Sequence, residues 1–320
     1  MIDLHLHLDG SLSVANAKEL AALQDIKIPD NDEEIKKLLS VDDDCKNLND
    51  FLQKFDFPCS LLQTKKALTL ATKNLLNELA GMGLLYAEVR FAPQLHTNKG
   101  ISQEDAICAV IEGVNEACIP ANVIICMMRG AKHEVNEESV ILAKKYLDKG
   151  VCAIDLAGAE AVYKTKEYED LFALAQKNNI PITIHAGEAD GPQSIYDAIS
   201  FGACRIGHGV RCLEDEKLVS LLAKEQIPLE CCPTSNVLTC IFDNISQFPL
   251  QKLLDLGLKV TINSDDMAVC NTSLVQEYKK LEDTFGLSLK DKKMLMLNAV
   301  DASFANDKLK EELRIKIANY

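Results

Sequence analysis

The sequence is poor in positive charge. Its 320 residues include 34 lysines and arginines against 48 aspartates and glutamates, which gives a formal net charge of −14. Phosphate backbones are repelled by such a surface, so we expect no nucleic-acid partner. An anionic small molecule is also a poor ligand unless a local basic pocket holds it. The acidity itself is typical of a soluble protein.

The chain also lacks the features of membrane and secreted proteins. No segment approaches the roughly 20 apolar residues that span a bilayer, so we expect no membrane partner. Residues 1–5 (MIDLH) have neither the basic start nor the apolar run of a signal peptide. The 12 cysteines include no C-x-x-C pair. These absences predict a cytoplasmic protein with reduced thiols.

Eight short segments rich in valine, isoleucine and leucine alternate with stretches of helical periodicity. Such apolar runs are typical of parallel strands that are buried on both faces. Eight strand–helix units favour an α/β fold of the (β/α)8 TIM-type barrel class. The expected strands are Ile2–Leu8, Leu84–Phe91, Val123–Met128, Val151–Leu156, Ile180–His185, Arg205–Gly207, Ile227–Cys232 and Leu258–Asn263.

An open doubly wound sheet is the second choice, because it would carry a glycine-rich phosphate turn after the first strand. Only Asp9-Gly10-Ser11 is found there. The connection from Leu8 to Leu84 is too long for one crossover helix. We therefore expect a helical insertion at approximately residues 12–82, over the C-terminal mouth of the barrel. A helical tail should follow Asp266, all within a single domain of residues 1–320.

Histidines and aspartates fall at the ends of several expected strands. His5 and His7 share one face of the first strand, His185 ends the fifth, and Asp265 follows the eighth. The C-terminal ends of barrel strands converge on one mouth. Three imidazoles and one carboxylate suit a single Zn²⁺ with a position left for water. Any one of these residues alone would be better explained as a core histidine or a helix cap.

Two further residues near these strand ends are candidates for proton transfer. His208, after the sixth strand, is not needed as a ligand and is left as a base. Glu188 lies three residues beyond His185, where burial would raise its pKa and suit it to act as an acid. Its alternative role is a carboxylate that stabilises a helix N-terminus. The fourth strand ends without a lysine that could bridge two metals, so one metal is the simpler interpretation.

Several short motifs, taken together and in order, resemble the adenosine deaminase family over nearly the whole chain. The motifs are HLHLDG at 5–10, EVR at 88–90, MR at 128–129, DLAG at 155–158, HAGE at 185–188, GHG at 207–209, CPTSN at 232–236 and SDD at 264–266. The resemblance implies a zinc-dependent hydrolase. It would convert adenosine, and 2′-deoxyadenosine, to inosine or deoxyinosine and ammonia in purine salvage.

The same resemblance assigns roles residue by residue. His5, His7, His185 and Asp265 would bind zinc, with His7 also against the substrate. His208 would deprotonate the attacking water, and Glu188 would protonate N1 of the purine. The remaining substrate contacts would be Asp266 to N7, the Gly158 N–H to N3, Asp9 to the ribose 5′-hydroxyl, and an apolar flap of Leu48, Phe51, Leu52 and Phe55.

The chain departs from the family pattern at two positions near the site. Met267 stands where the family usually has proline, which predicts a looser turn after Asp266. Gly130 stands where a histidine often follows Arg129. An adenine deaminase is the nearest competing function, although such enzymes usually carry glutamate at the position of Asp9. The motifs also fit a deaminase of a modified nucleoside, or a catalytically silent binding protein on the same fold. A silent protein should have lost a ligand or the acid.

Overall fold

The computed structural model describes residues 1–41, 45 and 47–319. Residues 42–44 and 46, in the expected insertion, and Tyr320, at the end of the expected tail, lie outside the described residues. Each of the eight predicted strands is present, and neighbouring strands pair in parallel. They are β1 Ile2–His7, β2 Tyr86–Phe91, β3 Ala121–Met128, β4 Val151–Ala157, β5 Thr183–Ala186, β6 Arg205–His208, β7 Leu229–Cys231 and β8 Val260–Ile262.

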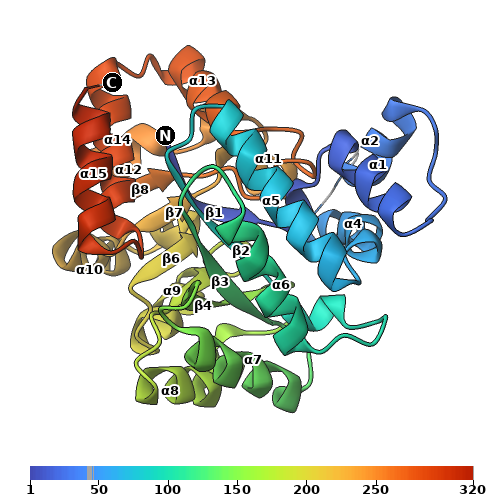
Figure 1. Ribbon diagram of the computed structural model, residues 1–320. Helices are drawn as coiled ribbons and strands as arrows, with labels where there is room; N and C mark the ends of the chain where they lie inside the picture. Colours follow the sequence, from blue (N-terminus) through green and yellow to red (C-terminus); the bar gives the residue numbers. More distant parts are fainter. Residues whose placement is uncertain (42–44, 46, 320) are drawn as a thin grey trace.

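The strands form two four-stranded sheets, β1-β2-β3-β4 and β5-β6-β7-β8. Single parallel bridges join the sheets at both seams, between Leu6 and Asp265 and between Ile154 and Ile182. At the first seam the His7 N–H donates to the Asp265 carbonyl at 2.9 Å. With helices outside the strands (Figure 1), the protein has the predicted α/β barrel architecture.

β5 and β7 begin later than the predicted Ile180 and Ile227. Pro181 and Pro228 precede the two strands and have no N–H with which to extend a ladder. Their carbonyls still accept hydrogen bonds from the neighbouring strands, from Ile154 and Ile206, both at 2.9 Å. The prolines therefore shorten the strands without separating them from the sheet.

Helices follow most strands and make up the insertion and the tail. None of those in the described part of the chain has the length and apolar character needed to cross a bilayer. The insertion holds α1 Val14–Leu23, α2 Asp32–Leu39, α3 Leu48–Leu52, α4 Asp56–Leu61 and α5 Lys65–Gly81. The barrel helices are α6 Gln103–Asn115, α7 His133–Tyr146, α8 Glu169–Lys177, α9 Pro192–Ser200, α10 Glu216–Glu225, α11 Pro233–Leu238 and α12 Leu250–Asp255, and the tail is α13 Leu274–Phe285, α14 Leu289–Ala302 and α15 Asp307–Ala318.

Polar residues begin several of these helices. The Asp215 carboxylate accepts hydrogen bonds from the N–H groups of Lys217 and Leu218 at the start of α10. Ser102 and Asp105 form a reciprocal capping box at α6. Such caps satisfy backbone donors that have no partner within the helix. They fix where each helix starts relative to the strand end before it.

The insertion helices α1, α2 and α4 lie on the right in Figure 1 and the tail helices α14 and α15 on the left, whereas α5 packs beside α6. One part of the insertion, α3 and the 3-10 turn η2 Gln53–Phe55, returns to the strand ends. Phe51 is buried there against Val269 and Cys270, which follow β8. This packing places α3 over the C-terminal ends of the strands, where the functional side chains are found.

Candidate active site

A cavity of about 490 Å³ opens at the C-terminal ends of the strands. Its lining combines residues of the strand ends with residues of the insertion. Every residue predicted to act in the site lines it except His5, which is fully buried beside it. The predicted residues on its wall are His7, Asp9, Leu48, Phe51, Leu52, Phe55, Gly158, His185, Glu188, His208, Asp265 and Asp266.

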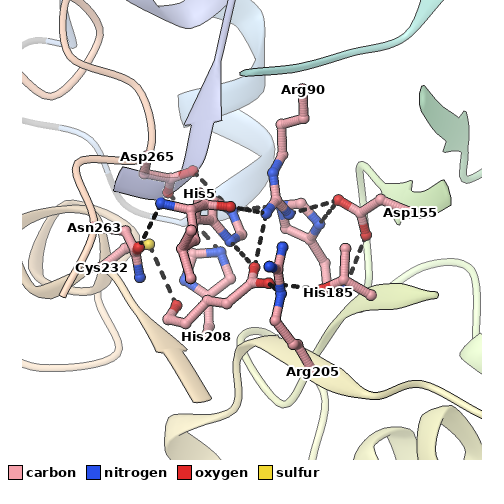
Figure 2. Close-up of polar contacts among 12 residues, drawn as sticks. His5, Arg90, Asp155, His185, Arg205, His208, Cys232, Asn263 and Asp265 are labelled. Atoms are coloured by element: carbon pink, nitrogen blue, oxygen red, sulfur yellow. Dashed lines mark hydrogen bonds and ion pairs between the residues drawn. The ribbon is translucent and has the colours of Figure 1, made fainter. Parts of the chain in front are cut away.

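Four of these side chains converge on one point. The Nε2 atom of His185 lies 3.0 Å from Nε2 of His5 and 3.2 Å from Nε2 of His7. The Asp265 Oδ1 atom lies 3.2 Å from Nε2 of His5 and 3.5 Å from Nε2 of His7. Figure 2 shows His5 between Asp265 and His185. His5 and His7 come from β1, His185 from β5, and Asp265 follows β8.

These distances fit a metal ion. Four zinc ligands at 2.0–2.1 Å in a tetrahedron lie about 3.4 Å from one another. The Nδ1 atoms of His5 and His185 face the carboxylates of Glu230 and Asp155, at 2.7 and 2.9 Å. With the proton on each Nδ1, next to these carboxylates, the two Nε2 lone pairs face each other. Such an arrangement is unfavourable unless a cation lies between them.

The charge state of the histidines agrees with metal binding. Burial lowers the pKa of His185 and holds that of His7 well below its ordinary value, so both imidazoles are neutral. Burial and the charge of Arg90 lower the pKa of His5, but the carboxylates of Asp265 and Glu230 outweigh them and raise it. Carboxylates that favour a proton on His5 would also favour a metal cation beside it.

A second group of donors overlaps the first. His5 and Asp265 also lie within reach of His208 and Cys232. Burial raises the pKa of the Cys232 thiol well above its ordinary value, and its Sγ donates to the Glu230 carbonyl at 3.5 Å. Because the thiolate is the metal-binding form of cysteine, the group with three imidazoles is the better metal site.

Two buried arginines pair with the carboxylates that contact the candidate ligands His5 and His185. Arg90 bonds to Asp155 at 2.7 Å and to Glu230 at 2.8 Å, and Arg205 bonds to Glu230 at 2.6 Å. Figure 2 shows Arg90 beside Asp155, which in turn contacts His185. Buried charges are tolerated when they are paired in this way. The arginines keep both carboxylates ionised, and the carboxylates orient the imidazoles of His5 and His185.

Two acids on the cavity wall have raised pKa values. Burial raises the pKa of Glu188 well above its ordinary value, and the charges of Asp265 and Glu160 raise it further. Burial and the same Asp265 carboxylate also raise the pKa of Asp266 well above its usual range. Both carboxyl groups can therefore donate a proton or a hydrogen bond at neutral pH.

His208 stands between the candidate ligands and Glu188. Its Nε2 lies 3.6 Å from Glu188 Oε2 and 3.9 Å from Asp265 Oδ2. The Asn236 side-chain nitrogen Nδ2 lies 3.1 Å from its Nδ1. His208 and Asp265 both have positive φ, at 58° and 61°. Left-handed backbone is uncommon in residues other than glycine and gathers at functional sites.

The turn after β8 is hydrogen-bonded to the turn after β1. The Met267 N–H donates to Ser11 Oγ at 3.1 Å, and the Ala268 N–H donates to the Gly10 carbonyl at 2.9 Å. A proline at 267 could not make the first bond. The structure thus gives no support to the looser turn expected from Met267, because Ser11 holds that turn in place.

The other departure has a different local reason. Gly130 has a φ of +80°, and a Cβ atom there would lie 2.6 Å from the Tyr163 ring. Tyr163 fills the space into which a side chain at position 130 would point. A histidine at this position would need a strained backbone and a shift of the Tyr163 side chain.

Four residues that the sequence analysis gave no role support the site. Asp155 and Asn236 lie within recognised motifs, but nothing in those motifs names their partners. Glu230 and Glu160 lie outside them. Glu230 reaches His5 across 225 positions of the chain, so its only sequence signal is a charged residue within the apolar run of the seventh strand.

An α/β barrel whose strand ends gather three histidines and an aspartate beside buried neutral acids defines a metal-dependent hydrolase. A family profile described as adenosine deaminase matches residues 1–320. An adenosine deaminase of Haemophilus ducreyi is 44% identical, over 98% of this chain and 94% of the relative. The chain belongs to the adenosine deaminase family and is a hydrolytic deaminase.

Solved structures agree with this family. An adenine deaminase from Arthrobacter aurescens is 28% identical, with a TM-score of 0.91 over 99% of this chain and 98% of that one. An N6-methyl-AMP deaminase from Arabidopsis thaliana is 27% identical, with a TM-score of 0.84 over 99% and 96%. Relatives that share this fold therefore act on different substrates, so the substrate of this chain has to be inferred from its own cavity.

Proposed function

We propose that this protein deaminates adenosine and 2′-deoxyadenosine to inosine and deoxyinosine, releasing ammonia, as a step of purine salvage in the cytoplasm. The proposed cofactor is one Zn²⁺ held by His5, His7, His185 and Asp265. The observation that carries the proposal is the convergence of these four donors beside the neutral carboxyl of Glu188. Deamination requires both features, because the purine ring resists attack until N1 is protonated.

A bound zinc ion would supply Lewis-acid chemistry, lowering the pKa of a water molecule towards about 7. The chain's own residues then handle the protons. His208 Nε2 accepts a proton from the attacking water and passes it to the departing amino group, which leaves as ammonia. Glu188 donates its proton to N1, where it stays in the product. The second proton of the water returns to Glu188, so the enzyme is regenerated.

His208 can act as a base only if Nε2 carries the lone pair. The Asn236 Nδ2 atom lies 3.1 Å from Nδ1, and a half-turn of this amide would bring its oxygen, which has no hydrogen-bond partner among the described residues, against Nδ1. Nδ1 would then donate and Nε2 would carry the lone pair. Burial lowers the pKa of His208 well below its ordinary value, so the ring is neutral before the reaction. Asn236 is thus proposed as the residue that orients the base.

The remaining proposed contacts hold the purine ring and the ribose. A neutral Asp266 donates to N7, which is an acceptor, and the N–H of Gly158 donates to N3. Asp9 is 4% exposed and lines the cavity, and its Oδ1 has no hydrogen-bond partner among the described residues. A ribose 5′-hydroxyl would satisfy that oxygen. Leu48, Phe51, Leu52 and Phe55 of the apolar flap exclude water from the reacting ring.

Asp9 also favours the nucleoside over the free base, since its proposed partner belongs to the sugar. A substrate panel of adenosine, deoxyadenosine, adenine and AMP, followed by loss of absorbance near the adenine band, tests the proposal. We expect both nucleosides to react, and adenine and AMP to react poorly. Asp9→Ala should weaken turnover of adenosine more than that of adenine, whereas the exposed Asp170→Ala control should change neither. Faster reaction of adenine would contradict the nucleoside assignment.

A further inference from the structure

Glu160 lies in the loop between β4 and the 3-10 turn η4 Thr165–Tyr168, and its side chain is 1% exposed. The carboxylate accepts hydrogen bonds from consecutive backbone N–H groups of the loop after β5. Oε1 accepts from Gly187 at 2.7 Å, and Oε2 accepts from Glu188, Ala189 and Asp190 at 3.0, 2.6 and 2.9 Å. The middle of this loop carries the proposed acid.

A chain of hydrogen bonds links this cluster to the backbone of His185 in the candidate metal site. Ser194 at the start of α9 donates its hydroxyl to Glu160 Oε1 at 2.5 Å and lies 2.7 Å from Thr165 Oγ1. Arg129 donates to Thr165 Oγ1 at 3.0 Å and to the His185 carbonyl at 2.7 Å. All five donors to Glu160 are uncharged, so the carboxylate is stabilised by oriented dipoles, as an anion is in a backbone nest.

This geometry fixes the loop on both sides of the acid. The N–H of Glu188 itself and those of both its neighbours are bound to one rigid group. Gly187 has a φ of +70°, and a Cβ atom there would overlap Ile195 of α9. The backbone therefore has little freedom to turn, and the direction of the Glu188 side chain is set by where Glu160 holds the peptide groups.

We propose that Glu160 is a positioning residue that aims Glu188 at the substrate by holding the backbone of residues 187–190. The proposal rests on the role of Glu188 proposed above. Glu160 does not line the cavity, and its hydrogen bonds among the described residues go to the loop after β5 and to Ser194. Its charge also keeps Glu188 protonated, since a nearby negative charge raises the pKa of that carboxyl.

Glu160→Gln keeps the shape of the side chain but turns one acceptor into a donor, which then faces bound N–H groups. We expect kcat on adenosine to fall about 100-fold, the loss typical of a misplaced catalytic group, with KM and zinc content nearly unchanged. Ser194→Ala removes one donor without this conflict and should lower kcat less. The exposed Glu169→Gln, the same chemical change on α8, is the matched control and should leave kcat unchanged.

A double-mutant cycle separates positioning from general support of the fold. If Glu160 acts through Glu188, Glu160→Gln should cause no further loss of kcat in a Glu188→Gln background. Equal losses in both backgrounds would overturn the proposal, and so would wild-type kcat in Glu160→Gln.

Hydrogen exchange provides a readout that does not depend on turnover. Amides 187–190 should exchange about tenfold faster in Glu160→Gln, as expected when a hydrogen bond is lost, while amides of β1 remain unchanged. Unchanged exchange at 187–190 would overturn the proposal. Wild-type protein inert on every purine of the panel would instead contradict the proposed function, and the exchange comparison would still decide whether Glu160 holds the loop.

Discussion

Glu188 shows how one side chain acquires its chemistry from its surroundings. It is 5% exposed, and burial together with the carboxylates of Asp265 and Glu160 raises its pKa. An ordinary glutamate would be ionised at neutral pH and could not protonate a purine nitrogen. The neighbouring negative charges are therefore part of the proposed mechanism as well as of the candidate metal site.

Glu188→Gln should keep its zinc and lose at least about 100-fold in kcat, within the usual range for a general acid. The amide can hydrogen-bond to N1 but cannot give it a proton. Wild-type kcat should also fall on the alkaline side as Glu188 loses its proton, because the ionised form is inactive. Steady-state rates across pH, with metal analysis of both proteins, check this. Near wild-type rates in the variant would rule out the role.

At the residue scale, the sequence predicts the candidate ligands but not the groups behind them. His5, His7 and His185 stand out because histidine is rare in the chain and these fall at strand ends. Glu230 and Asn236 give no such signal, since their roles depend on partners brought close only by the barrel. A single sequence contains no information about which buried carboxylate meets which imidazole.

At the scale of elements, apolar runs in the sequence predict the strands and their order. They predict the exact ends of strands and helices less accurately. Prolines shorten β5 and β7, and the apolar flap is divided between α3 and η2. The contact between the turns after β1 and β8 could not be predicted, because it joins segments at opposite ends of the chain. It is this contact that places Asp9 and Asp266 in one cavity.

Gly10→Ala tests the contact between the two turns. A Cβ atom at Gly10 would overlap the Asp266 carboxyl, so that side chain must move. We expect the zinc content to be retained and kcat/KM on adenosine to fall roughly 10- to 100-fold, as for a displaced substrate contact. Gly81→Ala, where an added Cβ meets nothing within 4 Å, is the control. Unchanged kcat/KM in Gly10→Ala would show that Asp266 is not held by this packing.

At the scale of the whole molecule, a buried histidine outside the candidate metal site links stability to pH. Burial lowers the pKa of His96 to about 4. In the unfolded chain its pKa would be near 6.5, so the unfolded state binds more protons between these values. The stability that depends on a neutral His96 is therefore fully present above pH 6.5 and is lost as the pH falls towards 4, by up to about 3 kcal/mol.

Denaturant unfolding at several pH values checks this effect. His96→Gln should remove a matching part of the loss in unfolding free energy between pH 6.5 and 4. His133→Gln changes an exposed histidine paired with Asp170, and should leave most of the loss in place. If the unfolding free energies of the wild type and His96→Gln fall equally between pH 6.5 and 4, His96 does not carry this dependence.

The two sheets meet at seams of single bridges, and the candidate ligands come from both sides of them. His5 and His7 belong to one half of the barrel, His185 to the other, and Asp265 sits at the junction. An ion held by all four residues would join the two halves of the barrel. Its removal would thus do more than stop the chemistry, because one of the links between the two halves would also be lost.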